Sequence, residues 1–508
     1  MPEPDLRASP SAELPADADQ LATAPRQSLL ADPEDSNSIW SGVALAAIAV
    51  LVLFGLYGLV LRSFMRVDIN YNEGWNAYNA TLALTHHLYP IKHGWTTVNY
   101  PFLSFFIIGQ LSRIHGDPLF IGRILSLAGL LLTSIAGYCI VRELAGHRLP
   151  ALFAALYFLW FIVAKQSDYV GMDDPQMLAQ AVMLCALYLY LRYGKNNWSL
   201  AAVAFLFVVG GNIKHNLLAA PLAVFVDLIL ASRSRALRYA FWGVLFLAGS
   251  VFVNQWAGGP FFLAQILTPR EYSLSKLSVG LWEFLSIAVP LCICAVWSVW
   301  SLVQARYRIL GLYFLISFAV GLAFYGGSGT VMNMFFDFFM AISLIMGIIL
   351  DSLWYAKLAG IRISGKLKWA APLLLWQIPC VAYPPVHHHE LRERQNQFDA
   401  EVAFLRSQPG PAICQSLSYC YFAGKPYVYD PFDSTSLVDA RLLDPTPMVQ
   451  RIEDHEFGAI QTNAPLPKIG IPNGYFPAAI FDAIEKNYRV AMEDAHCVIY
   501  VPRQEPES

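Results

Sequence analysis

The chain has 508 residues, of which 56% are hydrophobic and 14% are charged, and its mean hydropathy is +0.45. Ordinary soluble domains carry roughly 25% charged residues, so this composition excludes a soluble protein and indicates one whose apolar surface is covered by lipid. The net charge of −3 provides no basic field for a nucleic-acid partner.

The chain begins with a polar tail. Residues 1–38 are rich in Ala, Pro, Ser and Asp and lack apolar periodicity, which predicts a disordered tail. The first apolar run, residues 39–61, carries no charge and is long enough to cross a bilayer. Because this run starts late and follows an acidic tail, we interpret it as a membrane span and not as a cleaved signal peptide.

A polar segment, residues 62–118, separates the first span from the others. Within it, residues 102–111 are apolar but too few to span, so we expect an interfacial helix there. Further spans are predicted near 119–142, 148–164, 174–192, 198–213, 216–232, 238–256, 282–303, 309–326, 331–351 and 367–384. With the first run, this makes about eleven spans, and Lys214 and His215 separate the two short runs between 198 and 232.

Basic residues indicate the orientation of the spans. Lys and Arg gather in alternate short loops, namely Arg142, Arg148, Arg192, Lys195, Arg233, Arg235, Arg238, Arg306, Arg308, Lys357, Arg362, Lys366 and Lys368. Such loops are cytoplasmic by the positive-inside rule. The tail is then cytoplasmic, and the loops 62–118, 165–174 and 257–281 lie on the far side. An odd number of spans places the C-terminal region there as well.

The C-terminal region, residues 385–508, has the composition of a water-facing domain. Residues 389–406 are predicted to form a helix, and 412–422 and 497–501 look like strands between turn residues. We therefore expect a small extracytoplasmic α/β domain behind an α-helical polytopic membrane module, residues 39–384. Cys414 and Cys420 could pair if this domain lies in an oxidising compartment, and the sequence leaves that question open.

Two acidic clusters could carry chemistry. Asp68 and Glu73 follow the first span, and Asp173 and Asp174 stand between the third and fourth spans. Acidic residues beside a membrane are candidates for function, and the predicted topology brings both clusters, with Lys214, to the same face. The structural alternative is that these acids are solvated or cap the helices that follow them.

The segments around these acids resemble a known family. Residues 70–89 (NYNEGWNAYNATLALTHHLY) are similar to the first extracytoplasmic loop of GT-C glycosyltransferases, such as the protein O-mannosyltransferases and the lipid A aminoarabinose transferases. The stretches 100–102, 122–123, 173–178 and 211–215 fit the same pattern, so that the resemblance covers roughly residues 40–350. It implies a GT-C-like membrane fold. One position departs: Asn72 precedes Glu73 where the family usually has Asp before Glu.

The resemblance implies an enzyme that transfers a sugar from a polyprenyl-phosphate donor to an extracytoplasmic acceptor, which could be a lipid, a glycan or a protein. Such chemistry needs a carboxylate as base, which would be Glu73 or Asp68 if the family's base is the missing Asp. Asp173 or Asp174 would be a second acidic group. The leaving phosphate needs positive charge, for which the candidates are Lys214, His215, Arg123 and Arg270.

Cofactors and rival functions follow from the same residues. No cofactor is required, although carboxylates suit a divalent metal such as Mg²⁺ or Mn²⁺. The rival function is a transporter or flippase, and a third interpretation is an inactive relative with Asn72. Transporters usually show internal symmetry, and the one-sided acids without such symmetry favour the enzyme. The composition of the tail favours a bacterial inner membrane, with the active site and the C-terminal domain on the periplasmic side.

Overall fold

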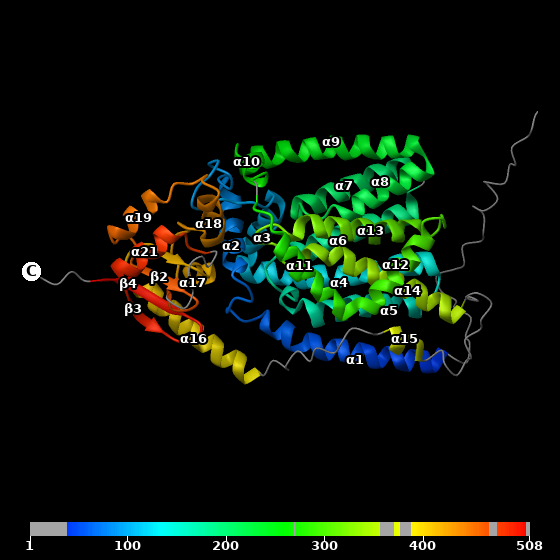
Figure 1. The fold of residues 1–508 in the computed structure, drawn as a ribbon, viewed down its shortest axis with the longest axis horizontal. Coiled ribbons are helices and arrows are strands. Elements are labelled where there is room, and N and C mark those ends of the chain that lie inside the picture. Colours follow the sequence, from blue (N-terminus) through cyan, green and yellow to red (C-terminus); the bar gives the residue numbers. More distant parts are fainter. Residues whose placement is uncertain are drawn as a thin grey trace, which may run out of the picture.

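The protein is represented by a computed structural model that describes residues 38–194, 196–268, 270–355, 370–375, 388–466 and 475–503. A long helical bundle occupies most of the molecule, and a smaller region with a β-sheet lies at one end of it, on the left in Figure 1. Almost all of the predicted tail, residues 1–38, lies outside the described ranges.

The bundle is built from helices of very different length. In chain order they are α1 (Ser38–Arg62), α2 (Asn72–Leu82), α3 (Phe102–His115), α4 (Pro118–Ala145), α5 (Arg148–Lys165), α6 (Gln176–Tyr193), α7 (Asn197–Ile213), α8 (Ala219–Ala231), α9 (Arg233–Gly258), α10 (Phe262–Ile266), α11 (Leu274–Glu283), α12 (Ala288–Ser301), α13 (Arg308–Tyr325), α14 (Phe336–Tyr355) and α15 (Ala370–Leu375). Short 3₁₀ turns precede or follow several of them.

Most of the predicted spans coincide with helices to within a few residues. Seven helical segments of the described chain are long and apolar enough to cross a membrane. The span predicted at 282–303 starts earlier, because α11 and α12 form one apolar segment, Leu274–Ser301. The helices α6, α7 and α8 match predicted spans but fall outside this set, and most of 367–384 lies outside the described residues. The protein is an integral membrane protein, while the count of eleven spans stays a prediction.

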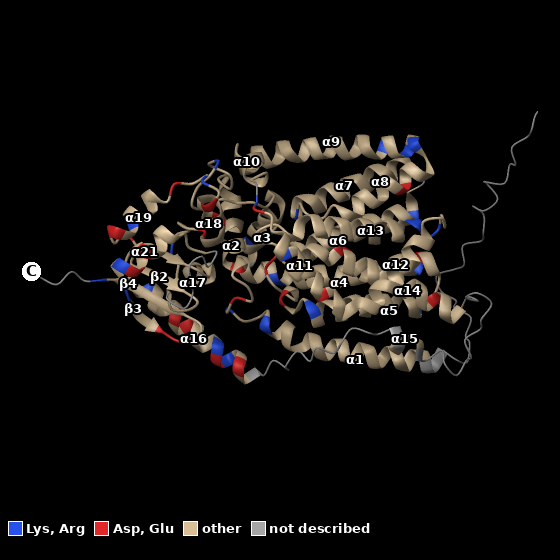
Figure 2. Ribbon diagram, viewed as in Figure 1, with Lys and Arg blue, Asp and Glu red and all other residues tan. Residues whose placement is uncertain are grey.

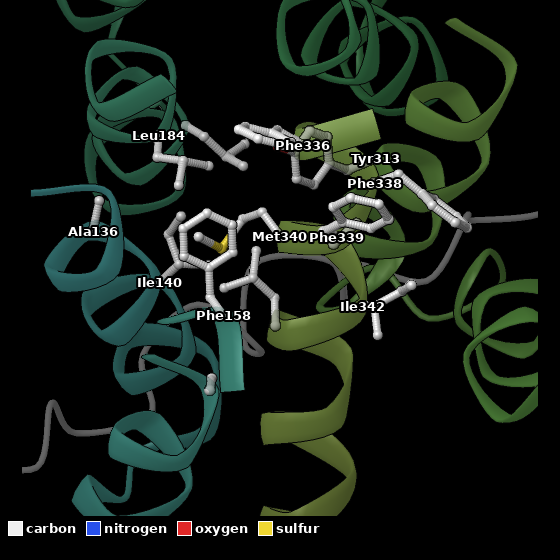
Figure 3. Close-up of a cluster of buried hydrophobic side chains, with 14 of the residues drawn as sticks. Ala136, Ile140, Phe158, Leu184, Tyr313, Phe336, Phe338, Phe339, Met340 and Ile342 are labelled. Atoms are coloured by element: carbon white, nitrogen blue, oxygen red, sulfur yellow. The ribbon is translucent and has the colours of Figure 1, made fainter. Parts of the chain in front are cut away.

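Helix α14 runs through the centre of the bundle, and most of its side chains are buried. Figure 3 shows Phe336, Phe339 and Met340 packed toward Phe158 and Ile140 of the neighbouring helices. The packing is also close between α4 and α6, where a Cβ atom on Gly129 would lie 2.6 Å from the backbone nitrogen of Leu178. Such packing fixes the ends of the helices, from which the loops of the bundle emerge.

Charged residues separate along the bundle. Lys and Arg gather at the end far from the sheet region, whereas many Asp and Glu residues lie near the junction with that region (Figure 2). At the distal end, Arg192 pairs with Glu143 and Arg308 pairs with Asp227, each at 2.7 Å. This distribution agrees with the alternation of basic and acidic loops predicted from the sequence.

The C-terminal region has the predicted α/β character. It contains α16 (His388–Ser407), β1 (Ala412–Cys414), α17 (Leu417–Phe422), α18 (Pro431–Asp439), α19 (Thr446–Glu453), β2 (Ala459–Thr462), α21 (Ala478–Asn487), β3 (Tyr488–Glu493) and β4 (Val498–Pro502). The strand order is β1-β2-β4-β3, with β1 parallel to β2 and the other pairs antiparallel. Alternate strand residues enter two apolar cores, one on each face of the sheet.

The strand predicted at residues 412–422 is wrong beyond its first three residues. The chain leaves the sheet after Cys414, where Ser416 N–H donates to the Gln461 side chain at 3.1 Å, and α17 follows. Cys414 and Cys420 form a disulfide with their Cα atoms 5.9 Å apart. A strand would separate these two atoms by roughly 20 Å, so the pairing and the strand exclude each other.

Candidate functional site

A cavity of about 630 Å³ is lined by residues from several loops of the bundle, among them the loop before α2 and the loop between α7 and α8. Its walls are loops between helices, which place side chains from distant parts of the sequence around one space. The polar and charged residues of its wall include Asn70, Tyr71, Asn72, Tyr100, Lys165, Gln166, Asp168, Asp174, Lys214, His215, Asn216, Arg270 and Asn333. A cavity of this size matches those that hold small organic ligands.

A buried ion pair forms part of the cavity wall. Lys214 Nζ lies 2.7 Å from Asp174 Oδ1, and both side chains are only 2% exposed. Asp174 Oδ1 also accepts from Gln176 N–H at 2.8 Å, where Pro175 precedes the start of α6. Burial lowers the pKa of Lys214, but Asp174 and Tyr100 raise it above its ordinary value. The cavity wall therefore contains the Lys214 ammonium group, held against the Asp174 carboxylate.

Two further predicted phosphate-binding residues line the same cavity. Arg270 is exposed and donates to the carbonyl oxygen of Ser328 at 3.2 Å. The pKa of His215 falls to about 4 because of burial and the nearby charges of Arg270 and Lys214. At neutral pH, His215 is thus an uncharged hydrogen-bonding group, and the positive charge comes from Lys214 and Arg270.

A second buried ion pair lies away from the cavity. Arg123 donates through Nε and Nη2 to the two oxygens of Glu73 at 2.8 and 2.6 Å, and both side chains are fully buried. Glu73 also accepts from the backbone N–H groups of Ile69 and Asp173 at 2.6 and 2.8 Å. Arg123 further donates to the carbonyl oxygens of Met65 and Val67. Both oxygens of Glu73 are thus occupied by hydrogen bonds from the protein, and Arg123 is fully paired.

The other two predicted acids are also outside the cavity wall. Burial and Glu73 raise the pKa of Asp68, which lies beside Ser416 and Ser418 of the C-terminal region. Among the residues that the structure describes, both carboxyl oxygens of buried Asp173 have no hydrogen-bond partner. Burial, followed by Glu73, raises the pKa of Asp173 well above its ordinary value, which favours the protonated form.

The sequence did not single out an acidic pair of the C-terminal region. Asp430 and Asp433 line a smaller cavity, of about 50 Å³, which shares Asn72, Tyr100 and Arg270 with the larger one. The only sequence signal is the helix start Asp430-Pro-Phe-Asp433. That signal predicts a helix cap, and only the tertiary fold shows that α18 faces the first loop.

The sequence left a divalent metal possible but not required. Within the described ranges, the structure contains no group of three or more His, Cys, Asp or Glu side chains placed to hold a metal ion.

Comparisons with known proteins match the fold. A family model described as dolichyl-phosphate-mannose-protein mannosyltransferase matches residues 99–256. The crystal structure of ArnT from Cupriavidus metallidurans bound to undecaprenyl phosphate is 12% identical, with a TM-score of 0.55, and the match covers 89% of this chain and 98% of ArnT. The apo state of the same protein is 11% identical, with a TM-score of 0.56 and coverage of 92% and 98%. No curated protein sequence matches at a significant level. The predicted GT-C-like fold is confirmed.

Proposed function

We propose that the protein is a glycosyltransferase that moves a sugar from a polyprenyl-phosphate-linked donor to an extracytoplasmic acceptor. The observation that carries this proposal is the buried Lys214–Asp174 pair in the wall of a 630 Å³ cavity at one end of a GT-C-like bundle. The comparisons support the donor class, since ArnT is solved with undecaprenyl phosphate and the matched family is named for a dolichyl-phosphate sugar.

The cationic residues suit the donor's phosphate. As the bond between sugar and phosphate breaks, negative charge grows on the leaving oxygen, and fixed positive groups stabilise it. Lys214 and Arg270 would supply these charges, and His215 would donate a neutral hydrogen bond. Asp174 positions the ammonium group of Lys214 through the 2.7 Å contact, so that little reorganisation is needed when the donor binds.

The donor's lipid tail requires an apolar groove. A cavity of about 290 Å³ is lined by Phe161, Phe284 and Phe339 and shares Lys165 and Gln166 with the larger cavity. A polyprenyl chain in this groove would place its phosphate in the larger cavity, beside the basic residues. The position of the site at the end of the bundle follows from this need to bind both lipid and water-soluble groups.

The side of the membrane and the remaining substrates belong to the proposal. The Cys414–Cys420 disulfide supports an oxidising compartment for the C-terminal region, such as the periplasm of a bacterium with the helices in its inner membrane. The transferred group is a hexose or pentose, and the acceptor is a lipid, glycan or protein. No step of this reaction requires a metal, so chelation by EDTA is expected to leave turnover unchanged.

Sugar release from a radiolabelled pool of polyprenyl-phosphate sugars tests this function. Purified wild type should release sugar, and Lys214→Met should lower the rate by at least about 10²-fold. The matched control is Lys486→Met, because Lys486 is an exposed lysine on α21, and this variant should behave as wild type. Binding of donor lipid without any release by wild type would contradict the proposal and favour a transporter.

A further inference from the structure

The smaller cavity joins the C-terminal region to the first loop of the bundle. It is lined by Asn72 and Trp75 of α2, by Asn99, by Arg270 and by the two acids at the start of α18, Asp430 and Asp433. Asn72 and Arg270 also line the donor cavity. A molecule in the smaller cavity would therefore lie next to a sugar whose phosphate occupies the larger one.

The two acids have different surroundings. Asp430 is committed to the helix start: its Oδ1 accepts from the N–H groups of Phe432 and Asp433, and its Oδ2 accepts from the Tyr427 hydroxyl at 3.1 Å. Asp433 is half-buried, and its two oxygens share one donor, Asn99 Nδ2, at 3.0 and 3.1 Å. Asp433 is thus the carboxylate with capacity for a further hydrogen bond.

Burial of the Asp433 carboxylate leaves it able to take a proton near neutral pH. Burial raises its pKa to about 6, against the opposing effects of Arg270 and Asn99. Burial and then Asp433 raise the pKa of Asp430 to about 8, and the phenol groups of Tyr71 and Tyr427 face the same pair. A carboxylate whose pKa lies near the working pH is well matched to general base catalysis.

Trp75 contributes a buried polar group to the residues around this cavity. Its side chain lines the cavity and is only 7% exposed. Its indole N–H has no hydrogen-bond partner among the described residues. A buried donor without a partner is costly, and an oxygen atom of a bound molecule would satisfy it.

The other carboxylates near the two cavities are placed differently from Asp433. Asp168 lines only the larger cavity, 3.7 Å from Arg62, and Asp68 and Asp173 line neither cavity. Glu73 is closed by Arg123, and Asp174 is paired with Lys214. Residue 72, which lines both cavities, is an asparagine, and an amide cannot accept the proton of a hydroxyl group. Among the described residues, the carboxylates that line the smaller cavity are Asp430 and Asp433, at the start of α18.

We propose that Asp433 is the general base of the transfer reaction and that the smaller cavity binds the acceptor. This inference rests on the proposed glycosyltransferase function. The acceptor's hydroxyl proton passes to the Asp433 carboxylate, and the hydroxyl oxygen forms a bond to the anomeric carbon. The bond between that carbon and the phosphate oxygen breaks, and its electron pair leaves on the polyprenyl phosphate beside Lys214 and Arg270.

The geometry also indicates the chemical class of the acceptor. One hydroxyl donates to Asp433, and a neighbouring oxygen accepts from the Trp75 indole. A volume of about 50 Å³ has room for a few such groups and not for a whole large molecule. These features fit the paired hydroxyl groups of a polyol such as a sugar, with the rest of the acceptor outside the cavity.

The first test compares Asp433→Asn with wild type, using the radiolabelled donor pool and a set of methyl hexosides as acceptors. Turnover should fall by about 10²–10⁴-fold with unchanged binding of donor lipid. Azide attacks without losing a proton, so it should restore sugar release to the variant. The control is Asp444→Asn, because Asp444, like Asp433, lies near a helix start, but it accepts from Thr446 N–H at 3.0 Å and lines neither cavity.

Two further variants separate base from scaffold. Asn72→Asp, added to Asp433→Asn, puts a carboxylate back on the shared wall and should recover at least tenfold in turnover. Trp75→Phe keeps a ring but removes the unpaired N–H, and it should raise KM for the hexoside with little change in kcat.

The outcomes distinguish the two proposals. If wild type releases sugar and Asp433→Asn does so at a similar rate, the base assignment is overturned while the transferase function stands. If Asp433→Asn is folded and inactive but neither azide nor Asn72→Asp restores release, Asp433 is structural and the assignment again fails. If wild type releases sugar to water but never to a hexoside, the polyol acceptor is overturned. If wild type releases no sugar at all, both proposals fall.

Discussion

Two buried ion pairs of similar geometry have different surroundings. The closest N–O distances are 2.6 Å in Glu73–Arg123 and 2.7 Å in Asp174–Lys214. In the first pair, each of the two Glu73 oxygens accepts two hydrogen bonds from the protein. The second pair lines a cavity that can hold a ligand. The difference teaches that a buried charge near a membrane marks function only where its remaining hydrogen-bonding capacity faces open space.

Among the variants of the two pairs, Arg123→Met should cause the largest loss of stability. Glu73 would remain buried without its partner, and removing one member of a buried pair costs about 3–5 kcal/mol of unfolding free energy. Thermal unfolding in detergent would measure the loss. Adding Glu73→Gln should recover part of the stability, because no unpaired charge remains. A loss below about 1 kcal/mol in the single variant would show that the pair does not hold the loop.

Lys214→Met should act mainly on the reaction. The lost ammonium would lower kcat by about 10²–10³-fold, as for other single electrostatic contacts in the transition state. Stability should fall less than in Arg123→Met, because Asp174 would face the cavity and its water. Steady-state rates beside unfolding curves give both quantities. Equal losses of stability in Lys214→Met and Arg123→Met would remove the distinction between the two pairs.

Asp173→Asn sharpens the comparison through pH. The pKa of Asp173 is higher in the folded state than in the unfolded state. Between these two pKa values the folded state binds more protons, so the stability of wild type falls as pH rises from the unfolded pKa to the folded one. The variant lacks this cost and should be more stable than wild type at neutral pH, by about 1.4 kcal/mol for each pH unit between the two pKa values. The two proteins should converge near pH 4. Unfolding curves from pH 4 to 8 check this, and a pH-independent difference would refute it.

The smallest effect should come from an exposed pair. Arg66 Nη1 lies 3.0 Å from Asp399 Oδ1, with the side chains 45% and 44% exposed. Solvent screens such a contact, so Asp399→Asn should change the free energy of unfolding by only about 0–1 kcal/mol. The measurement is the same unfolding experiment at low and high salt. An effect as large as that of Arg123→Met would mean that burial does not determine how much each ion pair stabilises the protein.

Sequence periodicity and loop charge could predict most of the membrane part. The helices α1, α4 and α5 begin and end close to the predicted spans, because a bilayer sets the length of an apolar run. The same alternation of loops could bring Asp174, Lys214 and Arg270 to one end of the bundle.

The surroundings of each acid could not be predicted in this way. Whether Glu73 is free or paired depends on the position of Arg123, which is fifty residues away in the chain. The contact between Asn99 and Asp433 joins residues 334 positions apart, and no local pattern encodes it. At residues 417–422, the aromatic side chains favour a strand, but the Cys414–Cys420 disulfide and the turn before α17 prevent it.

We expect the Asp174–Lys214 pair to serve the reaction and the Glu73–Arg123 pair to stabilise the fold. The most direct test is turnover per folded molecule in two double variants, Asp174→Asn/Lys214→Met and Glu73→Gln/Arg123→Met, assayed on the same radiolabelled donor pool. We expect the first to lose at least about 10²-fold in rate and the second to stay within about tenfold of wild type. Full turnover in the first variant, together with complete loss in the second, would contradict the account and return the catalytic role to Glu73.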